Sequence, residues 1–318
     1  MHHVAYCFDA NYQQHFAASL SSLVTTYGGK SSELKVHVVT DVANDKLEQF
    51  LRDFSARTGI AYEIHYLTIE HRSLLAKIPA KFLNSKGYLN LAAYFRIMLP
   101  ILVGDEVHKI LYLDSDTIVM SDVSELFDLD LGGLALGAVL DVDNEAMCRD
   151  HGYKAYFNSG VMILDLALWR AQDLAKKCLD HVWDENSNLL MADQCAINRV
   201  LSDNIFIVDA RWNRFVSNTP FSQSQSDEVI QNAAVIHFIT SQKPWFAWYE
   251  NKVGDLYLSS LRASQWPSPV SRMPKTVNEH LWTARKLNKQ GKHKEAISFY
   301  EILVGHLLKK VDGPASGA

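Results

Sequence analysis

The N-terminal part of the chain alternates between segments with a strand pattern and segments with a helix pattern. Apolar residues form short runs in the first kind, and in the second kind they recur every three or four positions, as Phe16, Leu20 and Val24 do. This alternation is typical of a mostly parallel sheet with helices on both faces, so we predict an α/β fold. The predicted strands are His3–Phe8, Leu34–Thr40, Tyr62–Ile69 and Lys109–Val119, and the predicted helices are Tyr12–Tyr27, Asn44–Arg57 and Asn90–Leu102.

The rest of the chain is less regular and ends in a helical segment. Three prolines between Gln265 and Lys275 mark a linker. Beyond them, the pattern predicts two helices in Val277–Lys310, joined at Gln290–His293, which resemble one tetratricopeptide unit. We therefore predict a large domain at 1–266 and a basic helical hairpin at 275–312. Further strands are predicted near Leu134–Leu140, Ser159–Asp165, Ile205–Val208 and Ala234–Phe238, and further helices near Trp169–Asn186 and Ala192–Leu201.

Composition narrows the class of protein. A formal charge of −5 does not favour general binding to nucleic acid, and four cysteines without a CxxC pair fit a reducing compartment. The sequence shows no signal peptide and no run of about 18 apolar residues, so we expect a cytoplasmic protein. Between residues 275 and 310, eight Lys or Arg stand against three Asp or Glu. This basic end suggests one of two roles. It is either a helix face exposed to solvent, or a surface that contacts an anionic glycolipid or the inner face of the membrane.

Two carboxylates follow the strongly apolar strand that ends at Leu113. Asp114 and Asp116 flank Ser115, and in an extended chain their side chains point the same way, roughly 6–7 Å apart at the backbone. Because buried carboxylates repel each other and lose solvation, they need a cation or a proton. A divalent ion fits, and it can bridge to phosphate oxygens. Two alternatives are a polar strand end that caps a turn and a haloacid-dehalogenase-type phosphatase, in which this motif usually opens the domain.

A histidine ends another apolar strand near the end of the predicted large domain. His237 is followed six residues later by Lys243. Taken by itself, His237 is better explained as a hydrogen-bonded core residue. Beside Asp114 and Asp116, its imidazole would complete a site that suits Mn²⁺ better than Ca²⁺, because imidazole is the softer ligand. Lys243 would then hold a phosphate as a point charge.

Six short motifs occur in the order found in family 8 glycosyltransferases. That family includes bacterial lipopolysaccharide galactosyl- and glucosyltransferases and, more distantly, glycogenin. The resemblance covers about residues 3–250 and implies a GT-A fold, a UDP-hexose donor, Mn²⁺ with Mg²⁺ as the alternative, and retention of the anomeric configuration. The motifs are Asp9-x-Asn11-Tyr12, Tyr94-Phe-Arg96, Leu113-Asp114-Ser-Asp116, Phe157-Asn158-Ser-Gly160-Val161, Ala192-Asp193-Gln194 and His237-x5-Lys243-Pro244-Trp245.

The resemblance also implies roles for individual residues. Those expected to bind the donor are Asp9 and Asn11 at the uridine, Lys243 at the diphosphate, Ser115 in the carboxylate motif, and Arg96, Asn158, Asp193 and Gln194 around the sugar. The metal would be held by Asp114, Asp116 and His237. Three of these residues also have a purely structural explanation: Arg96 and Asp193 as an ordinary ion pair, and Asn158 as a turn residue. The GT-A catalytic domain would occupy residues 1–266.

Two positions bear on the chemistry. The third residue after the histidine is Thr240, where the family usually has a glycine that lets the backbone approach the diphosphate. Asp193 and Gln194 are the candidate catalytic residues, and Gln194 stands where a covalent double displacement would need a carboxylate nucleophile. Because an amide is a poor nucleophile, we expect the acceptor hydroxyl to attack on the same face as the leaving phosphate.

These features together predict a retaining hexosyltransferase. It would move galactose or glucose from a UDP-sugar to a carbohydrate acceptor such as lipopolysaccharide or another surface glycan. Two alternatives stay open. One is a glycogenin-like enzyme that glucosylates itself, and the other is a non-catalytic nucleotide-sugar or partner-binding module whose helical end is the working part.

Overall fold

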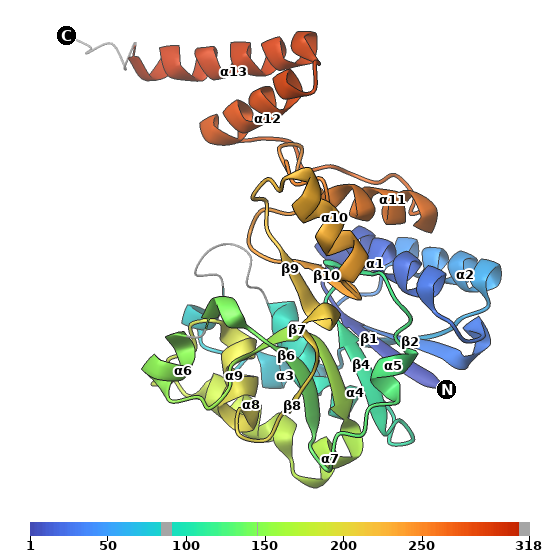
Figure 1. Cartoon of the computed structure of the whole chain (residues 1–318). Coiled ribbons are helices and arrows are strands. Elements are labelled where there is room, and N and C mark those ends of the chain that lie inside the picture. Colours follow the sequence, from blue (N-terminus) through green and yellow to red (C-terminus); the bar gives the residue numbers. More distant parts are fainter. Residues whose placement is uncertain (84–90, 145, 312–318) are drawn as a thin grey trace.

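A seven-stranded sheet forms the centre of the computed structural model, which describes residues 1–83, 91–144 and 146–311 (Figure 1). The strand order is β3-β2-β1-β4-β7-β6-β8, and β7 runs antiparallel to the other six. The predicted α/β fold with a mostly parallel sheet is therefore confirmed. The strands are β1 (His2–Cys7), β2 (Leu34–Thr40), β3 (Ala61–Tyr66), β4 (Lys109–Leu113), β6 (Leu136–Leu140), β7 (Phe157–Asp165) and β8 (Phe206–Ile207).

Helices cover both faces of this sheet. Because side chains alternate between the faces along each strand, one strand contributes to the buried core on each side. Val4 and Tyr6 of β1 belong to one buried core, and Ala5 and Cys7 belong to the other. The first core includes side chains of α1 (Gln13–Thr26), α2 (Asp45–Thr58) and α11 (Gly254–Ser264). The second includes side chains of a 3₁₀ helix (Leu91–Met98), α4 (Leu99–Leu102), α7 (Leu166–Ala171), α8 (Leu174–Trp183) and α9 (Ala192–Leu201).

The strand predicted at Lys109–Val119 is wrong, because the chain turns in the middle of it. β4 ends at Leu113 and β5 begins at Thr117. Between them the backbone N–H of Thr117 donates to the Asp114 carbonyl across 3.2 Å, and the Thr117 hydroxyl donates to the same carbonyl across 2.7 Å. A continuous apolar pattern gives no sign of such a turn.

The turn leads the chain into a second sheet of three strands, β5-β10-β9. β5 (Thr117–Val119) pairs antiparallel with β10 (Val235–Phe238), and Thr117 lies opposite His237. β9 (Arg214–Val216) pairs parallel with β10 on its other side. The second sheet therefore brings the histidine next to the carboxylates that end β4, although more than a hundred residues separate them in the sequence.

Several helices differ from the sequence-based expectation. The segment predicted as one helix at Asn90–Leu102 is the 3₁₀ helix followed by the short α4, and Asn90 lies outside the described residues. The helix predicted at Trp169–Asn186 breaks into α7 and α8, because Asp173 adopts a left-handed backbone with φ of 54°. Helices that the sequence patterns did not predict are α3 (Ile69–Leu75), α5 (Ser124–Phe127), α6 (Ala146–His151), α10 (Gln223–Asn232) and α11.

Two helices, α12 (Val277–Lys289) and α13 (His293–Val311), follow the proline-rich segment and project from the rest of the chain (Figure 1). The Lys286 ammonium donates to the Ala247 carbonyl across 2.9 Å, which ties α12 to the segment after β10. Asp312, which ends the predicted hairpin, lies outside the described residues. Within the described residues, no helix is long and apolar enough to cross a membrane.

Candidate active site

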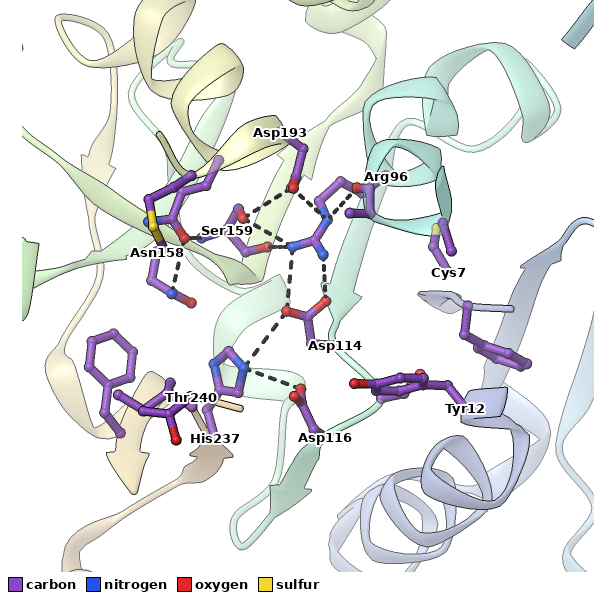
Figure 2. Close-up of a pocket in the computed structure, with 18 of the residues that line it drawn as sticks. Cys7, Tyr12, Arg96, Asp114, Asp116, Asn158, Ser159, Asp193, His237 and Thr240 are labelled. Atoms are coloured by element: carbon purple, nitrogen blue, oxygen red, sulfur yellow. Dashed lines mark hydrogen bonds and ion pairs between the residues drawn. The ribbon is translucent and has the colours of Figure 1, made fainter. Parts of the chain in front are cut away.

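A cavity of about 550 Å³ lies where strands of both sheets end (Figure 2). In α/β sheets, ligands bind beyond the carboxyl ends of parallel strands. The sequence-predicted residues that line the cavity are Asp9, Arg96, Asp114, Ser115, Asp116, Asn158, Asp193, Gln194, His237 and Lys243. Asn11 is the exception: it is exposed beside the lining residue Asp9, to which its backbone N–H and its side-chain amide both donate.

Three of these residues form a group that could hold a metal ion. Nε2 of His237 lies 3.2 Å from Oδ1 of Asp116 and 3.7 Å from Oδ2 of Asp114. One ligand atom from each residue lies within 4.8 Å of the others. Two carboxylates and one imidazole suit a divalent ion such as Mn²⁺ or Mg²⁺. The residues predicted as metal ligands are therefore brought together, and their chemistry fits the ion.

Asp116 is held in its charged form. Burial works to raise the pKa of its carboxyl, but the neighbouring Lys243 and His237 outweigh burial and bring the pKa well below its usual range. The Lys243 ammonium donates to Oδ2 of Asp116 across 2.7 Å and also to the Phe238 carbonyl. The lysine predicted to hold a phosphate thus lies in the cavity and rests on a candidate metal ligand.

The orientation of His237 is set by a chain of amide side chains. Nδ1 of His237 donates to Oδ1 of Asn213 across 3.0 Å, so the other ring nitrogen, Nε2, faces the carboxylates. Asn213 donates in turn to Asn158, Asn158 donates to Gln194, and Gln194 donates to Asp141. Partners of this kind fix the tautomer and the ring orientation of a metal-binding histidine.

Gly160 of β7 makes room for the group. A Cβ atom at this position would lie 2.3 Å from Cε1 of His237 and 2.7 Å from Oδ2 of Asp114. Both contacts are shorter than real Cβ atoms show, so a side chain here would displace the histidine or the carboxylate. The glycine in the Asn-Ser-Gly motif is therefore explained by close packing.

Arg96 connects the carboxylate motif with α9. Its guanidinium lies 2.9 Å from Oδ1 of Asp114 and 3.2 Å from Oδ2 of Asp193, and it donates to the backbone and side chain of Ser159. It also stacks 4.8 Å from the ring centre of Tyr112, whose hydroxyl donates to Asp114 across 2.5 Å. Arg96 and Asp193 thus form an ion pair inside the cavity wall, which fixes Asp114 from the side away from His237.

Asp193 and Gln194 lie side by side at the start of α9, after Ala192, whose φ of 50° is unusual for a residue with a side chain. Burial raises the pKa of Asp193 to about 6; Arg96 opposes this shift and Asp114 adds to it. The Gln194 amide is held at both ends: Oε1 accepts from Asn158 and from the Ser159 N–H, and Nε2 donates to Asp141.

The backbone at Thr240 has φ of 72°, a left-handed conformation that favours glycine. Thr240 lines the cavity at the position where family 8 glycosyltransferases usually have a glycine. A β-branched residue is strained in this region. The backbone shape that a glycine would supply is therefore present, with a threonine side chain added to it.

The predicted site residues do not include four residues that make polar contacts with them: Tyr112, Asp141, Ser159 and Asn213. Tyr112 had a weak signal, because it precedes Asp114 by two residues on a strand and so points to the same face. Ser159 stands inside the Asn158-Ser-Gly160 motif, but the motif does not show that it contacts Arg96. Asp141 and Asn213 have no signal that stands out, because each comes from a segment far from its partner in the sequence.

Comparisons with known proteins point to one family. The family model for glycosyl transferase family 8 matches residues 3–249. General stress protein A of Bacillus subtilis is 26% identical over 278 residues, which are 83% of this chain and 94% of the relative. The lipopolysaccharide 1,3-galactosyltransferase of Salmonella typhimurium is 23% identical over 309 residues, 93% of this chain and 88% of the relative.

Among solved structures, the galactosyltransferase LgtC in complex with donor and acceptor sugar analogues has a TM-score of 0.67. It is 22% identical in sequence, and the similarity covers 84% of this chain and 97% of that one. At this identity the likeness shows the fold. The family match spans the residues that build the cavity. The chain therefore belongs to glycosyltransferase family 8 and is a hexosyltransferase with a GT-A fold, as its motifs predict.

Proposed function

We propose that this enzyme transfers galactose or glucose from a UDP-sugar to a glycan acceptor, with retention of the anomeric configuration and with Mn²⁺ or Mg²⁺ held by Asp114, Asp116 and His237. The convergence of these three side chains in the cavity is the observation that carries the proposal. A divalent cation beside the Lys243 ammonium suits a diphosphate leaving group, because both offset its negative charge.

The end of β1 would hold the nucleotide. Asp9 follows the strand at the carboxyl edge of the sheet and lines the cavity, and Asn11 stands next to it. The Asp9 carboxylate accepts from the Asn11 backbone N–H across 2.9 Å, so the two side chains keep a fixed relation. We therefore assign both to the uridine, at the point where ligands of α/β sheets bind.

Lys243 would act on the leaving group. Its ammonium donates to Oδ2 of Asp116, one of the three residues that would hold the cation. With a diphosphate in the cavity, the Lys243 ammonium would turn from Asp116 to a phosphate oxygen and offset its negative charge, and Asp116 would be free to hold the cation. The cation would supply Lewis-acid stabilisation of the departing UDP.

The sugar would lie between the cation site and α9. Asp193 and Arg96 are positioned to hold its hydroxyls, and the Gln194 amide faces the cavity near them. Gln194 is a poor nucleophile, and Asp193 is paired with Arg96, so neither favours a covalent intermediate. We therefore propose same-face attack: the acceptor oxygen bonds to the anomeric carbon, the bond to UDP breaks, and the acceptor proton passes to the leaving phosphate oxygen.

The acceptor would be lipopolysaccharide or another surface glycan. Support comes from relatives named as lipopolysaccharide galactosyl- and glucosyltransferases. We place the catalytic domain at 1–266 and assign the basic hairpin at 275–312 to peripheral contact with the inner face of the membrane, in the cytoplasm. Alongside its basic residues, α13 exposes the apolar side chains Ile297, Ile302, Val304, Leu307 and Leu308, as a helix that lies on a lipid surface does.

A donor screen tests the proposal. UDP-galactose, UDP-glucose, ADP-glucose and GDP-mannose are each incubated with the enzyme, Mn²⁺ and a bacterial glycolipid fraction, and nucleotide release is measured. We expect one UDP-hexose to be used above the others and NMR to show an α-linked product. Preferred use of an ADP- or GDP-sugar, or a β-linked product, would contradict the proposal. Intact mass of the enzyme detects the glycogenin-like alternative, which would place hexose on a tyrosine of the chain itself.

A further inference from the structure

Three histidines from three neighbouring strands form a row across one face of the main sheet. Nε2 of His37 on β2 lies 2.9 Å from Nδ1 of His3 on β1, and Nδ1 of His37 lies 2.9 Å from Nε2 of His65 on β3. Glu63 is paired with His37 in the strand register, so it stands beside them on the same face. None of these residues lines the active-site cavity.

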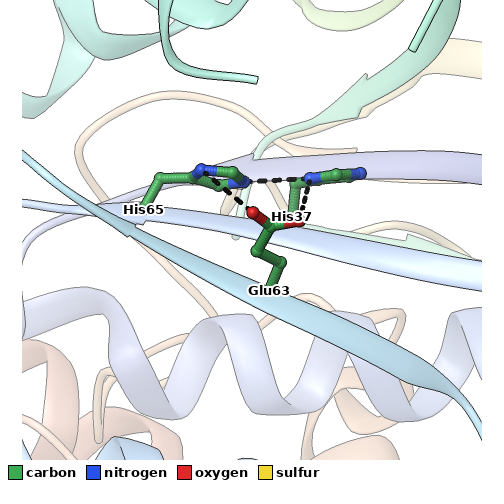
Figure 3. Close-up of side chains that lie close together, drawn as sticks. All are labelled: His37, Glu63 and His65. Carbon is green, nitrogen blue, oxygen red and sulfur yellow. Dashed lines mark hydrogen bonds and ion pairs between the residues drawn. The ribbon is translucent and has the colours of Figure 1, made fainter. Parts of the chain in front are cut away.

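We propose that His37, Glu63 and His65 form a second metal site, which binds a zinc ion. One ligand atom from each residue lies within 4.8 Å of the others (Figure 3). Two imidazoles and one carboxylate are a donor set that zinc prefers, and three protein ligands leave a fourth position for water. The site goes beyond the transferase function, because nothing in the proposed mechanism uses these residues.

The distances are close to those that zinc requires. With bonds of about 2.0–2.1 Å and tetrahedral angles, two ligand atoms lie about 3.3 Å apart. Nδ1 of His37 lies 2.9 Å from Nε2 of His65 and 3.9 Å from Oε2 of Glu63. The closest approach of His65 to Glu63 is made by the other ring nitrogen, Nδ1, which lies 4.0 Å from Oε1. The exposed Glu63 side chain must therefore rotate towards Nε2 of His65 to bring all three groups onto one ion.

The chemical state of the histidines also suits a metal. The His37 side chain is 1% exposed and that of His65 is 9% exposed. Metal binding needs a neutral imidazole that offers a lone pair, and burial favours the neutral form of a histidine ring. When Nδ1 of His37 binds the ion, its Nε2–H donates to His3, which is the supporting contact that metal-binding histidines usually have.

Lys35 limits the affinity of the site. Its ammonium lies 2.7 Å from Oε2 of Glu63, so it competes with a cation for that carboxylate. Glu63 is 45% exposed and can turn from the lysine to the ion at low cost. We expect Lys35→Met to bind zinc about tenfold more tightly, because it frees the carboxylate and removes a positive charge.

The test uses the full chain with the catalytic site disabled by Asp116→Asn and His237→Gln. This parent protein is dialysed at pH 7.5 against micromolar zinc, and bound zinc is measured by mass spectrometry. We expect one ion per chain in the parent, and loss of that ion with His65→Gln or Glu63→Gln. His108→Gln, which changes an exposed histidine outside the cluster, is the matched control and should keep the ion.

Circular dichroism checks that each variant is folded. We expect Glu63→Gln to keep the fold, because it changes an exposed side chain. Zinc should also raise the melting temperature of the parent but not that of Glu63→Gln, because a ligand that binds only the folded state stabilises it. A parent that binds no zinc, or a zinc content that is the same in the parent, His65→Gln and Glu63→Gln, would overturn the proposal.

Discussion

Asn213 fixes the ring of His237, because Nδ1 of the histidine donates to Oδ1 of the asparagine across 3.0 Å. This contact leaves Nε2 of His237 facing Asp114 and Asp116. Asn213 is buried at the end of a short 3₁₀ helix (Ala210–Asn213) that leads into β9. The proposed metal site therefore depends on a residue that would bind no metal itself.

The first prediction concerns this contact. Asn213→Ala should raise the Mn²⁺ concentration needed for half-maximal activity about 10- to 100-fold, because the imidazole loses the partner that orients it. Activity at saturating Mn²⁺ should fall much less. The measurement is a Mn²⁺ titration of UDP release. Asn204→Ala, at an exposed turn, serves as the control, and an unchanged titration for Asn213→Ala would show that the contact does not support metal binding.

Thr240 offers a prediction on strain. Its φ of 72° is costly for a β-branched residue, so Thr240→Gly should raise the free energy of unfolding by about 1 kcal/mol in a urea titration. It should also lower KM for the donor if the side chain crowds the diphosphate. Ser241→Gly is the matched control, because Ser241 is not in the left-handed region and glycine there only adds chain entropy. If Thr240→Gly instead lowers the free energy of unfolding, the backbone at Thr240 is not strained.

The ionisation of Asp193 should make the free energy of unfolding depend on pH. Burial first, with Asp114 adding to it, raises the pKa of Asp193 to about 6, above the value near 3.9 expected in the unfolded chain. Between these values the folded state holds the proton more tightly, so this residue's contribution to stability is present at low pH and is lost as the pH rises towards 6.

The comparison that isolates this effect is with Asp193→Asn, which cannot ionise. The free energy of unfolding of the wild type relative to the variant should fall by about 1–3 kcal/mol from pH 4 to pH 7. Urea titrations at four pH values measure it. A relative stability that rises with pH would mean that pairing with Arg96 outweighs burial.

Gln194 and Asp193 separate the two mechanisms. Under same-face attack, Gln194→Ala should slow turnover by roughly 10- to 100-fold through loss of a dipole near the developing positive charge, and Asp193→Ala should be the more damaging change through lost positioning of the sugar. Gln194→Glu should not make a trapped glycosyl-enzyme the productive route. An added hexose on a peptide that contains Asp193 or Gln194, seen by mass spectrometry during turnover, would instead favour double displacement.

Much of the main sheet could be predicted, because strands such as Leu34–Thr40 and helices such as Ala192–Leu201 carry apolar patterns of the right period. The turn after β4 could not be predicted, since apolar residues continue on both sides of Asp114–Asp116. Short helices such as α5 were also missed, because one turn is too short for a periodic pattern to show. Fold and family were therefore within reach of the sequence, and the break that shapes the site was not.

The site residues also fall into those that the sequence indicates and those that it does not. Asp114 and Asp116 stand out because charges at the end of an apolar strand are costly without a partner. Asn213 and Asp141 do not stand out, because an amide or a carboxylate in a connecting segment is common. Their importance comes only from contacts with His237 and Gln194 that the fold creates.

Metal-dependent transfer at Asp116 is the central claim, and the rate of UDP release from the preferred UDP-hexose tests it most directly. The wild type should lose activity in chelator and regain it with Mn²⁺. Asp116→Asn should lower kcat/KM by roughly a thousandfold or more at every Mn²⁺ concentration, because the amide keeps the shape but loses the charge that binds the cation. Asp227→Asn, at an exposed position on α10, should behave as the wild type. Full wild-type activity in chelator, or an Asp116→Asn enzyme as active as the wild type, would contradict the claim.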